Sequence, residues 1–114
     1  MNLGINDSSV NYDKVSQVYD TGRTANAETT EKLTRLLQIS ADSVVLDMGC
    51  GTGNYAYALR RLAKSVIGID LSVGMIRQAR MKFIELPFIC GDVTRMPFKS
   101  KTFDAAFAVQ VLHH

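Results

Sequence analysis

The feature that most constrains the fold of this chain is an apolar run that contains an acid and is followed by three closely spaced glycines. The run is Val44–Met48 with Asp47 near its end, and the glycines are Gly49, Gly51 and Gly53. A short apolar run bounded by turn residues is typical of a buried parallel strand. Glycines directly after a strand allow a tight turn and let a ligand approach the main chain. A helix-like stretch follows, and its free N–H groups would face that ligand, so we predict a nucleotide pocket in an α/β fold.

Two further apolar stretches also end in an acid, Val66–Asp70 and Phe88–Asp92. The first stretch lies far enough beyond Asp47 for the chain to form one helix and a second, parallel strand. An acid at the tip of a second strand suits the two hydroxyls of an adenosine ribose, so Asp70 is the predicted ribose ligand, with capping of the helix at Ser72 as the alternative. Asp92 could accept a hydrogen bond from the amine of adenine, or it could form an Asx turn.

The glycine spacing argues against a nicotinamide-dependent oxidoreductase, which remains the least favoured function. The dinucleotide fingerprint G-x-G-x-x-G would require a glycine where Asn54 stands, and here the third glycine, Gly53, comes one residue early. That fingerprint also leaves Asp92 at the third strand tip unexplained.

Four segments follow one another in a recognisable order: Leu46–Gly53, Gly68–Met75, Cys90–Phe98 and Phe103–His114. Together they resemble the class I S-adenosylmethionine-dependent methyltransferases, in particular the small-molecule branch that includes ubiquinone and menaquinone C-methyltransferases. An upstream pair, Tyr12-Asp13 and Tyr19-Asp20, is similar to that family's N-terminal segment, so the resemblance extends over nearly the whole chain. It implies binding of S-adenosylmethionine and transfer of a methyl group to a small-molecule acceptor.

The resemblance also implies roles for individual residues. Asp47 contacts or orients the methionine amine of the cofactor, Leu71 and Met75 enclose the adenine, and the Val93 N–H binds it. The backbone of Gln110 lies near the amino-acid end of the cofactor. The predicted cofactor-binding residues are Asp47, Gly49, Cys50, Gly51, Gly53, Asp70, Leu71, Met75, Asp92, Val93, Gln110 and Tyr19. No catalytic base is predicted, and no metal is expected.

Several of these residues have a structural alternative. The three loop glycines could serve the turn alone, Asp47 could cap the loop, and Met75 could belong to the core. Cys50 is interpreted as a small packing residue, Cys90 as a buried strand residue and Asp104 as structural.

Terminal residues offer weaker candidates for the site. Tyr12 and Tyr19 could anchor a helix, Tyr19 could instead line the pocket, and Arg23 could meet the cofactor carboxylate. The adjacent His113 and His114 would point to opposite sides of a strand, which makes a poor metal site and leaves a role near the acceptor.

Alternating patterns predict an α/β, Rossmann-like three-layer sandwich with a mostly parallel sheet. Helical spacing covers residues 12–19, 27–38, 54–63 and 72–83, and strands are predicted at 43–48, 65–69, within 88–92 and at 103–112. We divide the chain into a helical cap segment, residues 1–39, and a cofactor-binding core, residues 40–114. The resemblance supplies a sheet order that begins 3-2-1-4 when the four predicted strands are numbered along the chain.

The resembled domain continues through three more strands, so we expect a fragment or a truncated product. The fourth strand would then be an exposed edge that permits self-association. A non-catalytic module that binds S-adenosylmethionine without an acceptor site is the alternative function.

Composition narrows the remaining function classes. The net charge is +2 with dispersed basic residues, so a nucleic-acid partner is not expected. No apolar run reaches the length of a membrane span, and residues 1–10 lack the core of a signal peptide. Two cysteines without a framework spacing indicate reduced thiols and a cytoplasmic protein.

Overall fold

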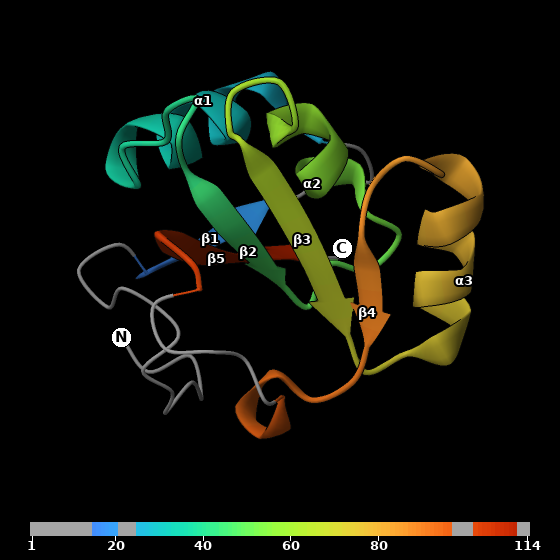
Figure 1. Ribbon diagram of the computed structural model, residues 1–114. Coiled ribbons are helices and arrows are strands. Elements are labelled where there is room, and N and C mark those ends of the chain that lie inside the picture. Colours follow the sequence, from blue (N-terminus) through green and yellow to red (C-terminus); the bar gives the residue numbers. More distant parts are fainter. Residues whose placement is uncertain (1–14, 21–24, 97–101, 112–114) are drawn as a thin grey trace.

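The computed structural model describes residues 15–20, 25–96 and 102–111 of the 114-residue chain. Strands and helices alternate along these residues, and from α1 to β4 they follow the order that the sequence pattern predicts (Figure 1). In chain order they are β1 (Val15–Asp20), α1 (Ala27–Leu36), β2 (Val44–Met48), α2 (Asn54–Leu59), β3 (Ser65–Asp70), α3 (Val73–Lys82), β4 (Phe88–Cys90), the 3₁₀ helix η2 (Val93–Arg95) and β5 (Ala105–Val111).

The five strands form one parallel sheet in the order β1-β5-β2-β3-β4. Read from the other edge, β4-β3-β2-β5 is the predicted order 3-2-1-4, which is therefore confirmed. The chain adds β3 and β4 on one side of β2 and then places β5 on the other side. This reversal creates a topological switch point between β2 and β5, where open α/β sheets bind their ligands.

The N-terminal strand β1 corrects two predictions. Residues 15–20 form a strand, although Val15, Val18 and Tyr19 have helical spacing. Valine and tyrosine suit a strand equally well, and pairing along the free side of β5 outweighs a short helical pattern. Because β1 pairs with β5 over six residues and β2 pairs with its other side, the fourth predicted strand is not an exposed edge.

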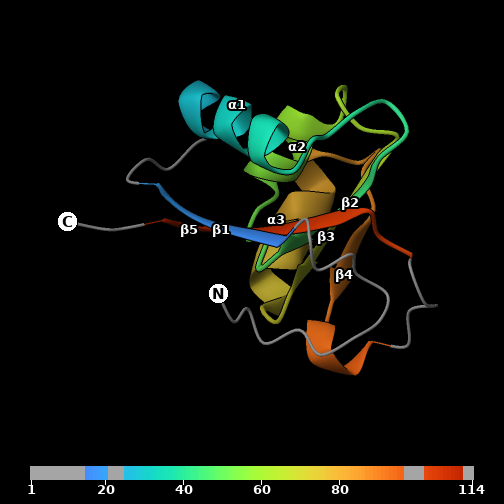
Figure 2. The ribbon, with the colours of Figure 1, turned by 90° about the vertical axis from the view of Figure 1, so that its left-hand side faces the viewer.

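The three α-helices pack on one face of the sheet (Figure 2). Their buried side chains share a core with alternate strand residues, among them Leu33 from α1, Leu59 from α2 and Ile76 from α3. The opposite face holds a smaller cluster that includes Leu46, Ile69 and Phe103 and is joined by Val93 of η2. Among the described residues no α-helix covers that second face, so the predicted third layer is not seen there.

Polar side chains cap the starts of α1 and α3. The Asn26 side chain accepts hydrogen bonds from the backbone N–H groups of Glu28 and Thr29, at 2.8 and 3.3 Å, and caps α1. The Ser72 hydroxyl accepts from the Met75 N–H and caps α3. Within the described part of the chain, no helix has both the length and the apolar character needed to span a bilayer.

Candidate functional site

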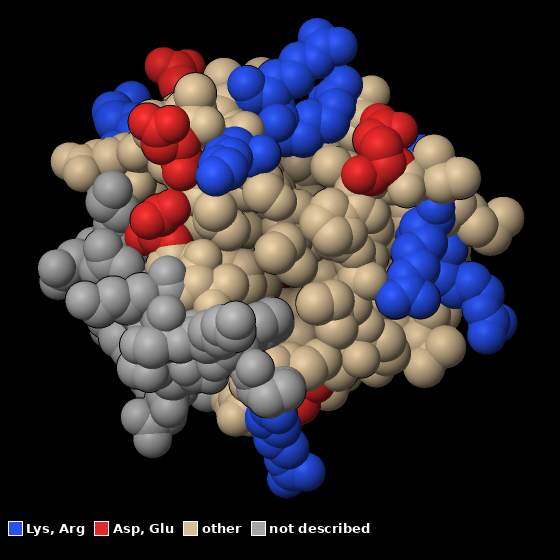
Figure 3. All heavy atoms as spheres, in the orientation of Figure 1, with Lys and Arg blue, Asp and Glu red and all other residues tan. Residues whose placement is uncertain are grey.

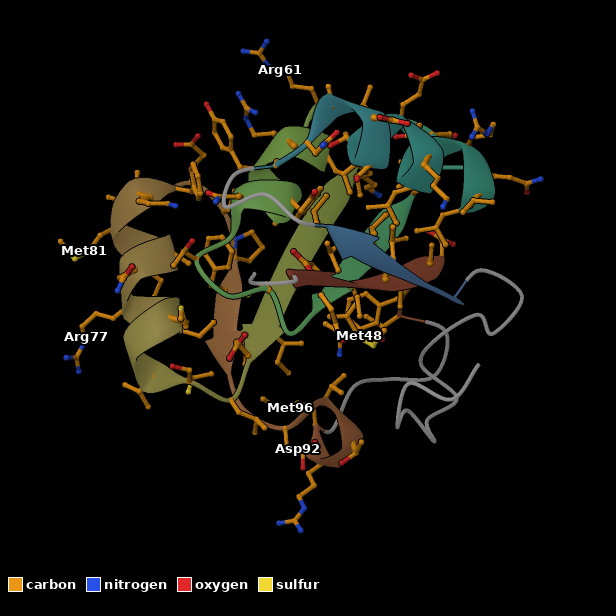
Figure 4. The ribbon with its side chains drawn as sticks, turned by 180° about the vertical axis from the view of Figure 1, so that it is seen from behind. Met48, Arg61, Arg77, Met81, Asp92 and Met96 are labelled. Carbon is orange, nitrogen blue, oxygen red and sulfur yellow. The ribbon has the colours of Figure 1, made fainter. Side chains whose placement is uncertain are left out.

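A hollow of ≈ 400 Å³ opens at the carboxyl ends of β2, β3, β4 and β5. The carboxyl ends of parallel strands meet at one edge of a sheet, and the switch point between β2 and β5 lies within this hollow. Its lining consists of strand-end and loop residues: Met48, Gly49, Ile69, Asp70, Leu71, Gly91, Asp92, Val93, Ala108 and Gln110. Figure 4 shows Met48, at the end of β2, on the same side of the sheet as Met96 and Asp92.

Six predicted site residues line this hollow together: Gly49, Asp70, Leu71, Asp92, Val93 and Gln110. Sequence reasoning missed four others, namely Met48, Ile69, Gly91 and Ala108. Met48, Ile69 and Gly91 are direct chain neighbours of predicted residues, and Ala108 stands two residues before Gln110 on β5. The period of two along a strand was the signal that could have found Ala108.

The glycine loop after β2 is held in a left-handed conformation. Gly49, Gly51 and Gly53 have φ angles of 66°, 57° and 88°, a region that side chains with a Cβ rarely adopt. Among the described residues, no atom lies within 4 Å of a Cβ added at Gly49 or Gly51. These two glycines are therefore required by the turn, and they leave open space above the main chain for a ligand.

Gly53 has a different reason to be glycine. A Cβ at this position would lie 2.5 Å from the Cζ atom of the Phe88 ring. Gly68 on β3 is equally close to Phe88, at 2.6 Å, and its added Cβ would lie 2.9 Å from the Cys50 sulfur. The close approach of Phe88 thus explains Gly53 as a packing residue, and Gly53 does not line the hollow.

Cys50 packs beneath the loop. Its side chain is partly buried and faces Gly68, and its backbone N–H donates to the Ile69 carbonyl at 3.0 Å. Burial, followed by the nearby Asp47 and Asp70 carboxylates, raises the pKa of the thiol far above its usual value. A thiol held protonated in this way is a poor nucleophile, which supports the packing interpretation. Cys90, expected to be buried, is exposed at the end of β4.

Asp47 lies under the loop instead of in the wall of the hollow. It is only 2% exposed, and its Oδ2 atom has no hydrogen-bond partner among the described residues. Burial first, and Asp70 second, raise the pKa of Asp47 well above its usual value, although a hydrogen bond from the Ala56 backbone N–H lowers it. Ala56 belongs to the first turn of α2, so this carboxyl group lies against the start of the helix that follows the loop.

Asp70 connects the loop to the start of α3. One carboxylate oxygen accepts from the Gly51 N–H at 2.8 Å, and the other accepts from the Ser72 N–H at 2.8 Å. Each oxygen has a second lone pair, which leaves capacity for the hydroxyl groups of a ligand. The predicted ribose contact and its helix-start alternative are therefore compatible.

Asp92 forms the Asx turn that sequence analysis gave as its alternative. Its Oδ1 atom accepts from the Thr94 N–H at 2.9 Å and from the Thr94 hydroxyl at 2.7 Å. These two bonds, together with the Arg95 guanidinium 3.8 Å from Oδ2, lower the pKa of Asp92. Because Asp92 also lines the hollow, an ionised carboxylate stands ready there to accept a hydrogen bond from a ligand.

Other predicted residues lie apart from the hollow. Met75 is 44% exposed on α3 and does not line it. Tyr19 occupies the register position beside Gln110, but its side chain lies outside the described structure. Asp104 accepts from the Val44 N–H at 2.8 Å, which confirms its structural role. The structure does not describe four candidates: Tyr12, Arg23, His113 and His114.

Charge and metal-ligand patterns add little to this site. On the face seen in Figure 3, Lys and Arg side chains form one group at the top and another at the right, with an acidic side chain between the two groups. Within residues 15–20, 25–96 and 102–111, no group of three His, Cys, Asp or Glu side chains could hold a metal ion.

The chain is similar in sequence to known methyltransferases. A family model described as a methyltransferase domain matches residues 45–114. The malonyl-[acyl-carrier protein] O-methyltransferase of Yersinia pestis is 33% identical over 97 residues, covering 85% of this chain and 36% of that protein. The demethylmenaquinone methyltransferase of Paenarthrobacter aurescens is 28% identical over 100 residues, covering 88% of this chain and 39% of that protein. The chain thus spans less than half the length of these relatives.

A solved structure supports the fold. An RNA methyltransferase from Salinibacter ruber, crystallised with S-adenosyl-L-homocysteine, superposes with a TM-score of 0.61. The alignment covers 77% of this chain and 60% of that one, and the two sequences are 18% identical. At this level of identity the match shows a shared fold and nothing finer.

Proposed function

Because this chain belongs to the class I S-adenosylmethionine-dependent methyltransferase family, we propose that the hollow at the strand ends binds S-adenosylmethionine. We further propose that the bound methyl group is transferred to a small-molecule acceptor. The observation that carries both proposals is the convergence of the open glycine loop with Asp70 and Asp92 around one hollow. A binding module without turnover is the alternative, and only an activity measurement separates the two.

The adenosine half of the cofactor fits the β3 and β4 ends. Asp70 retains lone pairs for the two ribose hydroxyls, and Asp92 is an ionised acceptor for the adenine amine. Leu71 is 73% exposed at the rim, so covering the adenine would remove an apolar side chain from water. The backbone of Val93 lies beside Asp92 and supplies the second adenine partner in this proposal.

The amino-acid half fits the glycine loop and the end of β5. Gly49 and Gln110 line the hollow there, and no atom of the described part of the chain lies within 4 Å of a Cβ added at Gly49 or Gly51. Asp47 is buried beneath the loop with one unpartnered oxygen. We therefore assign Asp47 the role of orienting the loop from below, without direct contact with the cofactor.

The chemistry required of the protein is modest. The sulfonium cofactor supplies an already activated methyl group, which the acceptor takes by in-line displacement. The chain's residues bind and orient the donor and exclude water at the strand ends, which are the main contributions to such a transfer. Strong electrostatic stabilisation of the sulfonium itself would not help, since that charge is lost in the reaction. A general base is needed only for an acceptor that must lose a proton.

A small-molecule acceptor group is favoured by the named relatives, which according to their names methylate malonyl-[acyl-carrier protein] and demethylmenaquinone. The small net charge of +2 favours the same conclusion over a nucleic-acid acceptor. Two free cysteines, Cys50 and Cys90, favour a reducing compartment, and we propose the cytoplasm.

Calorimetric titration with S-adenosylmethionine, with NAD as the comparison ligand, tests the proposal. We expect saturable binding of the sulfonium cofactor alone, and a loss of affinity of roughly ten-fold or more in Asp70→Ala. The matched control is Asp42→Ala, an exposed acid far from the hollow, which should bind like the parent chain. Binding of NAD, or no binding by a chain that circular dichroism shows to be folded, would contradict the assignment.

A further inference from the structure

Lys82, the last residue of α3, reaches across to the glycine loop. Its Nζ atom donates to the Asn54 side-chain oxygen at 2.8 Å and to the Thr52 hydroxyl at 3.2 Å. These two residues stand directly before and after Gly53 in the chain. The Lys82 ammonium group on α3 therefore binds the residues on both sides of Gly53.

The loop needs such ties because its glycines are conformationally free. On the β3 side it is fixed by two contacts, from the Cys50 N–H to the Ile69 carbonyl and from the Gly51 N–H to Asp70. Lys82 adds a tie on the α3 side. A loop fixed before the ligand arrives loses less conformational entropy on binding, which increases affinity.

The neighbouring rings fix the position of Lys82 itself. Phe83 stacks on Tyr57 of α2 with ring centroids 4.3 Å apart, and the Lys82 ammonium lies 5.0 Å from the Phe83 ring centroid. A Cβ at Gly53 would be 3.3 Å from Phe83. The end of α3 and the start of α2 thus form one packed unit, and the Lys82 contacts follow from its geometry.

We propose that Lys82 is a positioning residue, which holds the glycine loop in the geometry that binds the cofactor. The proposal rests on the proposed function, because affinity for the cofactor is its consequence. Lys82 does not line the hollow, so it acts through Thr52 and Asn54 and not by contact with the ligand.

Lys82→Met retains the aliphatic stem and removes the charge. We expect its Kd for S-adenosylhomocysteine to rise roughly three- to ten-fold, the effect of losing about one hydrogen bond. Lys82→Arg, which can still donate to both oxygens, should recover most of the affinity. Arg77→Met is the matched control, because Arg77 points away from the molecule on the same helix (Figure 4) and should leave the Kd unchanged.

Thermal unfolding and amide exchange separate positioning from simple stability. Lys82→Met should unfold at nearly the temperature of Arg77→Met, yet the Gly51 and Gly53 amides should exchange faster in it alone. A Kd equal to that of the parent chain, or unchanged exchange at these amides, would overturn the proposal. If the parent chain fails to bind S-adenosylhomocysteine at all, the proposed function fails, while the exchange experiment still decides whether Lys82 orders the loop.

Discussion

At the scale of single residues, the glycines of one loop are required for different physical reasons. Gly51 sits in a left-handed turn under open space, whereas Gly53 is also pressed against the Phe88 ring. A motif states only that a residue without a Cβ is needed. It does not say whether the missing Cβ makes room for a ligand or for the protein's own core.

Gly53→Ala should therefore destabilise the fold by about 2–4 kcal/mol, combining the left-handed backbone with overpacking against Phe88. Gly74 is the matched control, because it lies in α3 with nothing nearer than the Ser72 hydroxyl at 3.8 Å from an added Cβ. Gly74→Ala should be neutral or stabilising by up to about 1 kcal/mol, since alanine favours a helix. Urea denaturation of both variants measures the difference, and equal midpoints would contradict the packing role of Gly53.

Asp47 makes stability depend on pH in a defined direction. Burial raises its folded-state pKa well above the ordinary value of 3.8, so the folded protein retains a proton that the unfolded chain has lost. The stability associated with this proton is complete below about pH 3.8 and is lost as the pH rises toward the folded pKa.

Asp47→Asn cannot titrate, and its amide oxygen can still accept from the Ala56 N–H. The variant should therefore gain stability relative to the parent chain as the pH is raised from 4.5 to 7.5, measured by urea denaturation at each pH. The lowered pKa of Asp92 acts in the opposite direction but cancels in the comparison, because both chains contain it. A difference that does not change with pH would show that Asp47 is ionised in the folded state.

At the scale of elements, the segments whose own pattern is strong were predicted well. β2, β3 and α3 fall within one or two residues of the expected bounds, because apolar runs, helix caps and turn residues all agree there. β1 was missed because six residues with two valines and a tyrosine fit either period, and only pairing with β5 decides between them. The site residues show the same difference. The acids at the strand tips could be predicted from their own segments, whereas the place of Ala108 in the wall depends on which face of β5 meets the hollow.

A double-mutant cycle tests the placement of β1. Val18 is buried at 6% exposure and lies opposite Val109 in the parallel register, and both contact the same core. Val18→Ala and Val109→Ala should each cost about 1–2 kcal/mol and should be coupled by about 0.5 kcal/mol or more. Val18 with Val66 on β3, two strands further away in the sheet, provides the comparison pair. Additive effects for Val18 and Val109 would place residues 15–20 elsewhere.

At the scale of the whole molecule, the proposed ligand contacts strands on both sides of the switch point, β3 on one side of β2 and β5 on the other. The hollow takes lining residues from the ends of β2, β3 and β5 and from the turn after β4, so it connects the two sides of the switch point. Binding to the folded state alone should raise the free energy of unfolding by about 2.7 kcal/mol at a ligand concentration of one hundred times Kd.

Because the contacts are spread over these strands, we expect S-adenosylhomocysteine to slow amide exchange in β2, β3 and β5 together. Asp70→Ala at the same ligand concentration is the control and should show little gain, since its affinity is reduced. Protection confined to the turn after β4 would mean that the ligand is held at the adenine end alone, and that the glycine loop contributes little to the site. Protection on both sides of the switch point would instead show that one ligand ties β5 to β2, which is the arrangement that transfer from a fixed donor requires.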